Sequence, residues 1–350
     1  MKIAPLMEAY KNSPQIKPIL VHTGQHYDEE MSDLFFRQLK IPEPDVNLGV
    51  GSAPHGKQTG QMLEKMETIL LQEKPDICIV YGDTNSTLAG ALAAAKLHIP
   101  VAHIEAGLRS FNRKMPEEIN RVLTDHISSL LFCPTKIANE NLKKEGIFQG
   151  VHETGDVMYD CILFYAQKAK SVEEKLLKKL NIKLKSYYLA TVHRAENTDD
   201  KIRLANIIEA INELATPQSP VVFPLHPRTA GYVDAYGLKF AETVRVIEPV
   251  PYLEMITLES NAKLILTDSG GIQKEAYCLN VPCVTLREET EWVETVETGG
   301  NILAGADKDR IIKSGNFIID SRFKNSSSVY GDGNAAKRVL NILFDFLPQE

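Results

Sequence analysis

The chain has 350 residues, of which 43% are hydrophobic and 24% are charged, and its formal net charge is −7. This length and apolar content suit two globular domains rather than one, and they argue against disordered and fibrous classes. The negative charge argues against a general nucleic-acid surface, although a local group of donors would be enough to bind a small anion. Apolar runs such as residues 77–80 and 264–266 are strand-sized, and no run of hydrophobic residues is long enough to span a bilayer.

The spacing of the cysteines and the first residues of the chain indicate the cellular compartment. The five cysteines occur in apolar contexts without CxxC spacing, at Cys78, Cys133, Cys161, Cys278 and Cys283. An odd and scattered set of this kind favours buried reduced thiols in the cytoplasm over a disulfide framework or a zinc site. Residues 1–6 also lack the long apolar core of a secretory signal. We therefore expect a cytoplasmic protein without a membrane segment.

Short β-rich runs alternate with helical stretches along the chain, which is the pattern of parallel α/β layers. In the first half the predicted strands are residues 19–22, 77–81, 101–104, 130–133 and 151–154, with helices at residues 60–72 and 87–96. A lysine-rich helical stretch then ends near residue 185, and the second series of strands is residues 187–192, 221–225, 244–247, 264–267 and 281–286. The domain boundary is expected near residues 155–159, with a cleft where the strand-end loops of both units converge.

Polar residues collect at the ends of these predicted strands. The first group is Gly82-Asp83-Thr84, which lies between strand 77–81 and a helix rich in small residues. Asp and Thr are common helix N-caps, so a purely structural role is one interpretation. The other interpretation is that Asp83 is an acid or a base at the carboxyl edge of the sheet.

Two further acidic positions follow in the first half of the chain. Glu105 ends the apolar strand 101–104, and Glu117 lies beside Glu118 just after a proline. Carboxylates in a first helical turn favour the helix macrodipole, so one of these two adjacent glutamates can be simply a helix-start charge. Carboxylates at Asp83, Glu105 and Glu117 around one cleft would raise one another's pKa, which would provide acid and base forms together at neutral pH.

Histidine and arginine occur together at two strand ends of the second series. His193 and Arg194 follow the first strand of that series, and His226 and Arg228 follow the second. A single histidine is usually structural, but two at equivalent strand ends with arginines beside them suggest a wall that faces an anion. Their spacing is neither HxxxH nor HxH, so a metal site is not supported.

The last polar group is Ser269-Gly270-Gly271, after strand 264–267, with Glu275 one helical turn later. Glycines allow a ligand to approach the backbone, and N–H groups at a helix start point toward a diphosphate. Glu275 would then bind ribose hydroxyls. A tight turn alone would also explain the glycines. The pattern is neither GxGxxG nor GxxxxGK[ST], so neither Rossmann NAD binding nor a P-loop is supported.

Taken together, these segments resemble the non-hydrolysing UDP-N-acetylglucosamine 2-epimerases. They occur in the family order over nearly the whole chain, as residues 22–26, 82–84, 103–109, 116–118, 193–197 and 268–276. The resemblance implies a glycosyltransferase-B type fold with Rossmann-like domains at residues 1–157 and 158–333, and a C-terminal helix within residues 334–350 that returns to the first domain. It also implies a homodimer and a UDP-sugar substrate, with no metal or redox cofactor.

The resemblance assigns roles by position. The acid/base carboxylates would be Asp83, Glu105 and Glu117, and the catalytic-site histidine would be His193. UDP would be bound by Lys2, Ser269, Gly270, Gly271 and Glu275. Bacterial members are also activated by their UDP-sugar at a neighbouring allosteric site, and the matching substrate-binding or allosteric positions are Gln25, His26, Lys57, Arg194 and His226, with Glu117 shared between the two sites.

The chain departs from the family pattern in two places. The family begins with a buried strand and a Gly-[Thr/Ala]-Arg-Pro motif, whereas this chain begins at the Lys2-Ile3-Ala4-Pro5 that follows them. We expect about a dozen further residues, a strand and a turn, to precede Met1 in the functional protein, because the apolar strands of the first sheet need neighbours. Residues 110–115 form a shorter segment than in the commonest members. Together with residues 25–28 and 291–294, this segment resembles the branch that includes epimerases of UDP-2,3-diacetamido-2,3-dideoxy-glucuronate.

Inversion at C2 of such a sugar breaks a C–H bond that no adjacent carbonyl acidifies. An enzyme without NAD can eliminate UDP across C1–C2 to give 2-acetamidoglucal, and can add UDP back after a proton has returned to the other face of C2. The predicted function is this conversion of UDP-N-acetylglucosamine to UDP-N-acetylmannosamine, for surface-polysaccharide precursors. The alternatives are 2-epimerisation of the diacetamido-glucuronate, a hydrolysing epimerase, a glycosyltransferase of the same fold and an inactive nucleotide-sugar binder.

Overall fold

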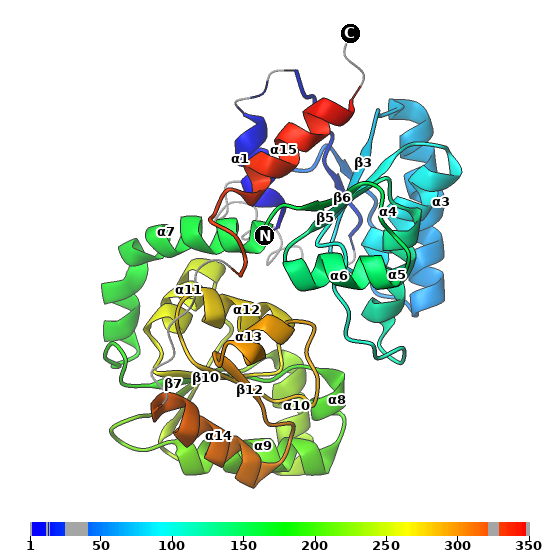
Figure 1. Ribbon diagram of the computed structural model, residues 1–350. Helices are drawn as coiled ribbons and strands as arrows, with labels where there is room; N and C mark the ends of the chain where they lie inside the picture. The colour runs from blue at the N-terminus through cyan, green and yellow to red at the C-terminus, as the bar shows by residue number, and fades with distance from the viewer. Residues whose placement is uncertain (1, 12, 14, 25–40, 321–328, 348–350) are drawn as a thin grey trace. The chain divides into compact units, whose positions relative to one another are not determined.

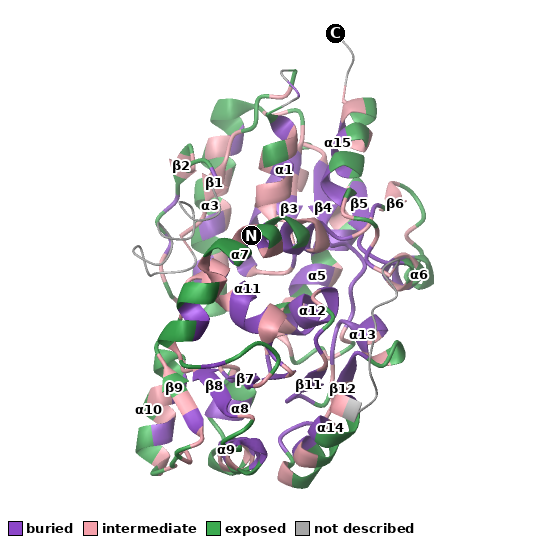
Figure 2. Cartoon of the chain, turned by 90° about the vertical axis from the view of Figure 1, so that its left-hand side faces the viewer, coloured by how far each residue is buried: buried purple, intermediate pink, exposed green. Residues whose placement is uncertain are grey.

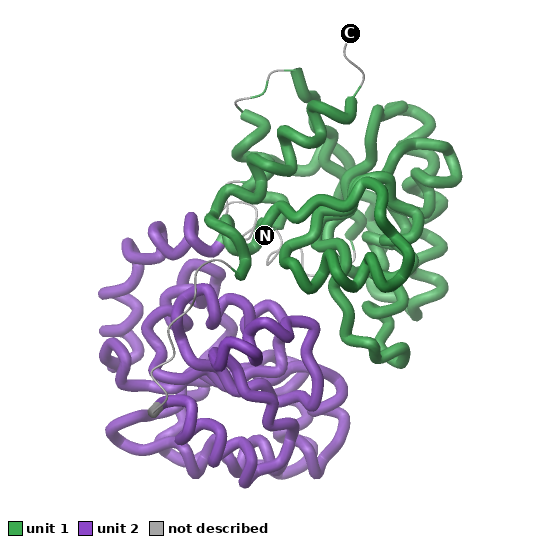
Figure 3. Tube along the Cα trace, in the orientation of Figure 1, with its two compact units in different colours: residues 1–161, 328–350 green, residues 162–327 purple. Residues whose placement is uncertain are grey.

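The computed structural model of the chain describes residues 2–11, 13, 15–24, 41–320 and 329–347. The chain divides into two compact units, one of residues 1–161 and 328–350 and the other of residues 162–327 (Figure 3). Each unit contains a parallel sheet whose strands are connected through helices. The predicted α/β class with parallel sheets is therefore confirmed.

The main sheet of the first unit has parallel strands in the order β3-β4-β5-β6 (Figure 1). These strands are β3 (Cys78–Tyr81), β4 (Val101–Ile104), β5 (Leu130–Cys133) and β6 (Val151–Glu153). The connecting helices are α4 (Asn85–Lys96), α5 (Pro116–Ile127) and α6 (Lys136–Lys144), and α3 (His55–Glu73) packs against α4. Because consecutive parallel strands require such crossovers, the carboxyl ends of all these strands lie at one edge of the sheet.

A second, small parallel sheet in this unit pairs β1 (Val21–His22) with β2 (Val46–Asn47). The pairing extends beyond the strands, since Val46 N donates to Leu20 O at 3.2 Å. Within the described residues, no strand joins β1 to β3, so the two sheets are separate. The sequence did not indicate β2, because a strand this short carries no measurable alternation.

Helices α1 (Ile3–Tyr10) and α15 (Ala335–Phe346) lie side by side on one face of the β3–β6 sheet (Figure 1). Leu6 of α1 and Leu343 of α15 pack in one buried core with Phe132 of β5. The other face of the sheet packs against α3 and α4. The sheet is thus covered by helices on both faces, as parallel sheets require.

The start of α15 is capped by a side chain from a distant part of the chain. Asp160, on helix α7 (Val157–Lys179), accepts hydrogen bonds from Ala335 N at 3.1 Å and Ala336 N at 2.8 Å. The first N–H groups of a helix have no partner within the helix, so a carboxylate placed there stabilises it. Burial raises the pKa of Asp160 to about 6, against the effect of these two hydrogen bonds.

The sheet of the second unit has parallel strands in the order β12-β11-β10-β7-β8-β9. The strands are β7 (Tyr188–Thr191), β8 (Val221–Pro224), β9 (Val244–Ile247), β10 (Leu264–Thr267), β11 (Cys283–Thr285) and β12 (Asn301–Leu303). The helices that follow α7 are α8 (Ala195–Thr198), α9 (Lys201–Leu214), α10 (Pro227–Tyr236), α11 (Tyr252–Asn261), α12 (Gly270–Cys278), α13 (Val293–Glu297) and α14 (Lys308–Asp320). Strand order reverses between β7 and β10, and ligands of open α/β sheets bind at such a switch point.

The central strands of this sheet, β7, β8, β10 and β11, are buried almost throughout, and so is helix α12 (Figure 2). Leu264 and Leu266 of β10 pack with Ile207 of α9, whereas Ile265 packs on the opposite face with Leu258 of α11. Alternation of this kind follows from the pleat of a strand buried on both faces. All five cysteines are buried with free thiols, as predicted. None of the helices in the described part of the chain is long and apolar enough to cross a membrane.

Candidate functional site

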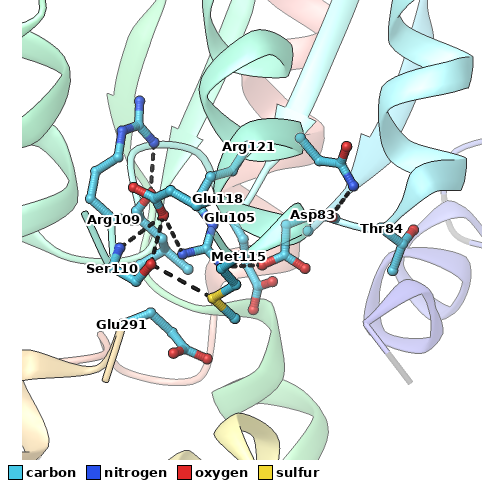
Figure 4. Close-up of polar contacts among 12 residues, drawn as sticks. Asp83, Thr84, Glu105, Arg109, Ser110, Met115, Glu118, Arg121 and Glu291 are labelled. Carbon is cyan, nitrogen blue, oxygen red and sulfur yellow. Dashed lines mark hydrogen bonds and ion pairs between the residues drawn. The ribbon is translucent and has the colours of Figure 1, made fainter. Parts of the chain in front are cut away.

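Two of the predicted carboxylates lie at neighbouring strand ends of the β3–β6 sheet (Figure 4). Asp83 follows Gly82 at the end of β3, and Glu105 directly follows β4. Glu105 is 4% exposed, and its backbone φ is +73°. Residues with a side chain seldom adopt this left-handed conformation, so the direction of the Glu105 carboxylate is set by an unusual turn of the chain.

Glu105 is paired with Lys2, the residue to which the family resemblance assigns phosphate binding. Lys2 Nζ forms an ion pair with Glu105 Oε2, and 34% of the Lys2 side chain is exposed. Gly82, with φ +65°, provides the space for this pair. A Cβ at Gly82 would lie 2.8 Å from Lys2 Nζ and 3.3 Å from Glu105 Oε2. Any larger residue at position 82 would therefore disturb the ion pair.

Asp83 is oriented by helix α5. Arg121 Nη2 donates to Asp83 Oδ2 at 2.5 Å, and Asn120 Nδ2 donates to the Asp83 carbonyl at 2.9 Å. The Arg121 side chain is 2% exposed, whereas that of Asp83 is 30% exposed. A buried guanidinium thus holds, by a charge-assisted hydrogen bond, a carboxylate that still reaches solvent.

Helix α5 also distinguishes the two glutamates of its first turn. Glu118 is 2% exposed and accepts hydrogen bonds from Ser110 N at 2.9 Å, Phe111 N at 3.0 Å and Arg121 Nη1 at 2.9 Å (Figure 4). These contacts fix the loop before α5 and give Glu118 a structural role. Glu117 is half-buried beside it and remains the predicted acid/base residue of the pair.

A buried network of charges, which the sequence reasoning missed, braces these strand ends. His103 Nε2 bonds the Gly82 carbonyl at 2.7 Å, and His103 Nδ1 bonds Asp125 Oδ1 at 2.6 Å. Arg109 donates to Asp125 Oδ2 and to both oxygens of Glu145, each at 2.7 Å. Burial alone would raise the pKa of Asp125, but His103 and Arg109 hold it below its usual value. The available signal was a histidine inside the otherwise apolar β4.

In the second unit, the predicted catalytic histidine lies at the switch point between β7 and β10. The backbone N–H groups of His193 and Arg194 donate to the Asp268 carboxylate at 3.1 Å and 3.0 Å, and Asn197 Nδ2 donates at 3.1 Å. His193 Nδ1 lies 3.3 Å from Asp268 Oδ1. Burial alone would raise the pKa of Asp268, but its bonds from His193, Arg194 and Asn197 keep the pKa below its usual value. Asp268 therefore orients a histidine whose side chain is 41% exposed.

His226 is the second histidine of the predicted anion-facing wall. It is the N-cap of α10, where its Nδ1 accepts from Arg228 N at 3.2 Å. Its ring centroid lies 6.3 Å from that of His193. Burial, together with the neighbouring His193 and Arg228, lowers the pKa of His226. The structure thus brings His193, Arg194 and His226 together at the ends of β7 and β8.

The Ser-Gly-Gly segment forms the start of helix α12. Ser269 is its N-cap, and Ser269 Oγ accepts from Ile272 N at 3.5 Å. A Cβ at Gly270 would lie 2.2 Å from Glu291 Oε1, so packing within the protein already explains that glycine. Gly271 is exposed, and a Cβ there would meet only Ser269 Oγ, at 3.7 Å. Gly271 is therefore the glycine that leaves the helix start open to a ligand.

Glu275, the predicted ribose ligand, lies further along α12 and is 3% exposed. Tyr252 OH donates to Glu275 Oε1 at 3.1 Å. Burial raises the pKa of Glu275, and Tyr252 and Lys274 act in the opposite direction. A buried acceptor at this place in a helix suits a neutral hydroxyl ligand better than an anion.

Three predicted substrate-binding or allosteric positions remain, Lys57, Gln25 and His26. Lys57 is exposed in the first turn of α3, in the first unit. Gln25 and His26 lie outside the described residues. Over residues 2–11, 13, 15–24, 41–320 and 329–347, no group of three or more His, Cys, Asp or Glu side chains is placed to hold a metal ion.

Comparison with known proteins gives consistent matches over almost the entire chain. The model of the UDP-N-acetylglucosamine 2-epimerase family matches residues 8–344. A UDP-N-acetylglucosamine 2-epimerase homolog of Methanococcus maripaludis is 54% identical over 351 residues, which cover 98% of this chain and 96% of the relative. The UDP-2,3-diacetamido-2,3-dideoxy-D-glucuronate 2-epimerase of Pseudomonas aeruginosa is 50% identical over 349 residues, with coverage of 98% and 96%. The crystal structure of Methanocaldococcus jannaschii UDP-GlcNAc 2-epimerase in complex with UDP-GlcNAc and UDP matches with a TM-score of 0.90 and 47% identity, and covers 98% of this chain and 96% of that one.

Proposed function

The chain belongs to the UDP-N-acetylglucosamine 2-epimerase family, and we propose that it interconverts UDP-GlcNAc and UDP-ManNAc by inversion at C2. The observation that carries the proposal is the pair of carboxylates at neighbouring strand ends, Asp83 and Glu105. Each is paired with a cation from another element, Arg121 for the first and Lys2 for the second. Such pairs keep two acid–base groups close together with defined orientations.

The proposed reaction is an elimination followed by an addition. A carboxylate removes the proton from C2 while the bond from C1 to the UDP oxygen breaks, which leaves 2-acetamidoglucal and UDP together in the site. A second group returns a proton to the opposite face of C2, and the UDP oxygen then re-forms its bond to C1. The two faces require two acid–base groups, for which Asp83, Glu105 and Glu117 are the proposed residues.

Departure of UDP requires donors and positive charge around its phosphates. The start of α12 supplies backbone N–H groups, and a helix N-terminus favours an anion. We assign UDP binding to Lys2, Ser269, Gly270, Gly271 and Glu275, with His193 as the catalytic-site histidine. Support for this assignment comes from the open approach at Gly271 and from the fixing of His193 by Asp268.

A second candidate substrate is UDP-2,3-diacetamido-2,3-dideoxy-glucuronate. It is favoured by the 50% identity to the P. aeruginosa enzyme that bears this name, against 47% to two archaeal enzymes named for UDP-GlcNAc. The chemistry at C2 is the same for both sugars. They differ in the C3 acetamido group and the C5 carboxylate, so turnover of the two purified substrates at equal concentration distinguishes them.

Assembly, regulation and location are further parts of the proposal. We propose a homodimer in which the UDP-sugar also acts as an allosteric activator, through Gln25, His26, Lys57, Arg194 and His226. A cytoplasmic location is proposed because all five cysteines are reduced and buried, which suits a reducing compartment.

One experiment tests the proposed reaction against its rivals. The protein is incubated in deuterated water with UDP-GlcNAc and, in a parallel sample, with UDP-2,3-diacetamido-2,3-dideoxy-glucuronate, and NMR follows the C2 position and the products. The expected result is UDP-ManNAc with deuterium at C2. Free N-acetylmannosamine plus UDP would instead identify a hydrolysing epimerase, transfer of the sugar to an acceptor would identify a glycosyltransferase, and no exchange with either candidate substrate would leave only a nucleotide-sugar binder.

A further inference from the structure

The second unit contains a buried carboxyl group that the proposed reaction does not use. Glu259, on α11, is 0% exposed. Neither of its carboxyl oxygens accepts a hydrogen bond from any donor in the part of the chain that the structure describes. An ionised carboxylate in such a place would lose its hydration without compensation, which is strongly unfavourable.

The neighbour of Glu259 is Glu275, the carboxyl group assigned to ribose binding. Tyr252 lies two helical turns before Glu259 on α11, so both residues share one face of that helix. That face contacts α12, because Tyr252 OH donates to Glu275 Oε1. The Glu259 and Glu275 carboxyl groups are therefore neighbours, and the charge of Glu275 acts on Glu259. Two ionised carboxylates can only accept hydrogen bonds. A hydrogen bond between them therefore exists only when one of the two carries a proton, as in other buried carboxyl pairs.

The surroundings decide which glutamate carries the proton. Glu275 accepts a hydrogen bond from Tyr252 and lies next to Lys274, so its ionised form is the better stabilised. Burial raises the pKa of Glu259 well above its usual value, and the charge of Glu275 raises it further.

No cation faces Glu259 among its other described titratable neighbours. Burial raises the pKa of the Cys283 thiol on β11 to about 12 and also raises that of the Tyr187 hydroxyl before β7, so both groups are neutral. Tyr187 OH donates to the Leu258 carbonyl rather than to Glu259. Glu173 of α7 bonds Asn261, at the end of α11. None of these groups supplies a positive charge that would stabilise ionised Glu259. Glu259 is therefore uncharged, and Glu275 is the acceptor for its proton.

We propose that Glu259 is a positioning residue, which stays protonated and donates a hydrogen bond to Glu275, so that Glu275 is held as an ionised acceptor for the hydroxyl groups of a nucleotide ribose. The ligand part of this inference rests on the proposed function. The shared proton itself is a property of the protein alone. The two parts can therefore be tested separately.

The test compares three variants with the wild-type protein. Glu259→Gln replaces the protonated acid by an amide of the same shape that donates permanently. Glu259→Leu fills the same volume with no donor. Glu254→Gln, on the same helix but partly exposed, is the matched control. Each protein is examined by UDP titration calorimetry and by thermal unfolding, from about pH 5 to about pH 9.

The thermal measurement follows the proton. The pKa of Glu259 is raised in the folded state, so between the ordinary glutamate pKa and this raised value the folded protein holds one proton more than the unfolded chain. The stability of the wild-type protein therefore falls as the pH rises through that window. We expect the unfolding temperature of Glu259→Gln to exceed that of wild type by a margin that grows with pH, while Glu254→Gln follows wild type. An equal pH dependence in wild type and Glu259→Gln would overturn the shared proton.

The calorimetric measurement follows the positioning role. Glu259→Gln should bind UDP within about twofold of wild type, and Glu259→Leu should bind roughly tenfold more weakly, the effect of one lost charge-assisted hydrogen bond. Wild-type affinity in Glu259→Leu would overturn the positioning role. If wild-type protein failed to bind UDP at all, the proposed nucleotide site would be wrong, and the unfolding comparison would still decide where the proton lies.

Discussion

Glu105 adopts its left-handed backbone conformation at the point where β4 ends, with φ +73°. For a residue with a Cβ this conformation costs about 1–2 kcal/mol, so the surroundings must stabilise it. The next residue, Ala106, continues the sheet by donating to Phe132 O at 3.1 Å, and Lys2 holds the Glu105 carboxylate. The unfavourable backbone conformation of Glu105 is thus held in place by a backbone hydrogen bond of the next residue and by the ion pair of its own side chain.

The acid–base residues give the first prediction. Asp83→Asn, Glu105→Gln and Glu117→Gln are each expected to lower turnover by about 10²-fold or more, the usual scale for such groups. UDP affinity should change far less, because the UDP ligands are assigned to other residues. Steady-state kinetics and UDP calorimetry on the same samples check this.

Glu118→Gln is the matched control for the first prediction, since it makes the same chemical change one residue away. It weakens the bonds to Ser110, Phe111 and Arg121, so it is expected to lower the free energy of unfolding by about 1–3 kcal/mol. Near-wild-type rates in all three variants of the first set would assign the chemistry to other residues.

The start of α12 gives the second prediction. Gly271→Val points a side chain into open space, so the fold should be retained while UDP binding is lost. Gly270→Ala instead displaces the Glu291 carboxylate, which is paired with Arg287 at 3.2 Å, and should cost about 1 kcal/mol of stability. Calorimetry that shows undiminished UDP affinity in Gly271→Val would refute the phosphate assignment.

At the level of single residues, the sequence identified the polar residues at strand ends but not the side chains that form hydrogen bonds and ion pairs with them. Asp83 and Glu105 stand out because a polar residue after a buried strand is visible locally. Arg121 is 38 positions from Asp83, and no local pattern reveals such a pair. For the same reason the local pattern around the preceding proline did not separate Glu117 from Glu118, and it was the family resemblance that assigned the acid/base role to Glu117. The hydrogen bonds of Glu118 assign that residue to the loop.

At the scale of elements, the buried strands were the most predictable part of the fold. β4, β5, β9 and β10 have the predicted ranges because each is a short, mainly apolar or β-branched run bounded by polar residues or proline. β2 and β12 were missed. Both strands are too short to show the alternation of apolar and polar residues that indicates a strand, and each contains an asparagine, which is uncommon in strands.

The cap of α15 gives the third prediction. Asp160→Ala removes the acceptor of two N–H groups and should lower the free energy of unfolding by about 1–2 kcal/mol. Asp345→Ala, at an exposed position of the same helix, should have little effect. Urea unfolding followed by circular dichroism measures both. Equal stability of the two variants would show that Asp160 does not hold the helix.

At the scale of the whole molecule, the proposed allosteric site gives the fourth prediction. Conversion that starts from UDP-ManNAc alone should be slow, and a trace of UDP-GlcNAc should accelerate it by about tenfold, within the usual range of allosteric coupling. His226→Asn should lose most of this acceleration. Initial-rate measurements in both directions check the expectation, and hyperbolic kinetics unaffected by added UDP-GlcNAc would exclude an activating site.

The division of the first unit between two stretches of chain has a consequence for synthesis on the ribosome. The four strands β3 to β6 have all been made once residue 161 is added, but α15, which covers one face of their sheet, begins only at Ala335. At about 5–20 residues per second, translation of the intervening chain takes roughly 10–30 s. During that time the nascent sheet exposes the apolar surface that Val339 and Leu343 later bury, while the second unit, which is continuous in sequence, can already fold. We therefore expect chaperones to bind the first half of this chain, rather than the second, while it is being made.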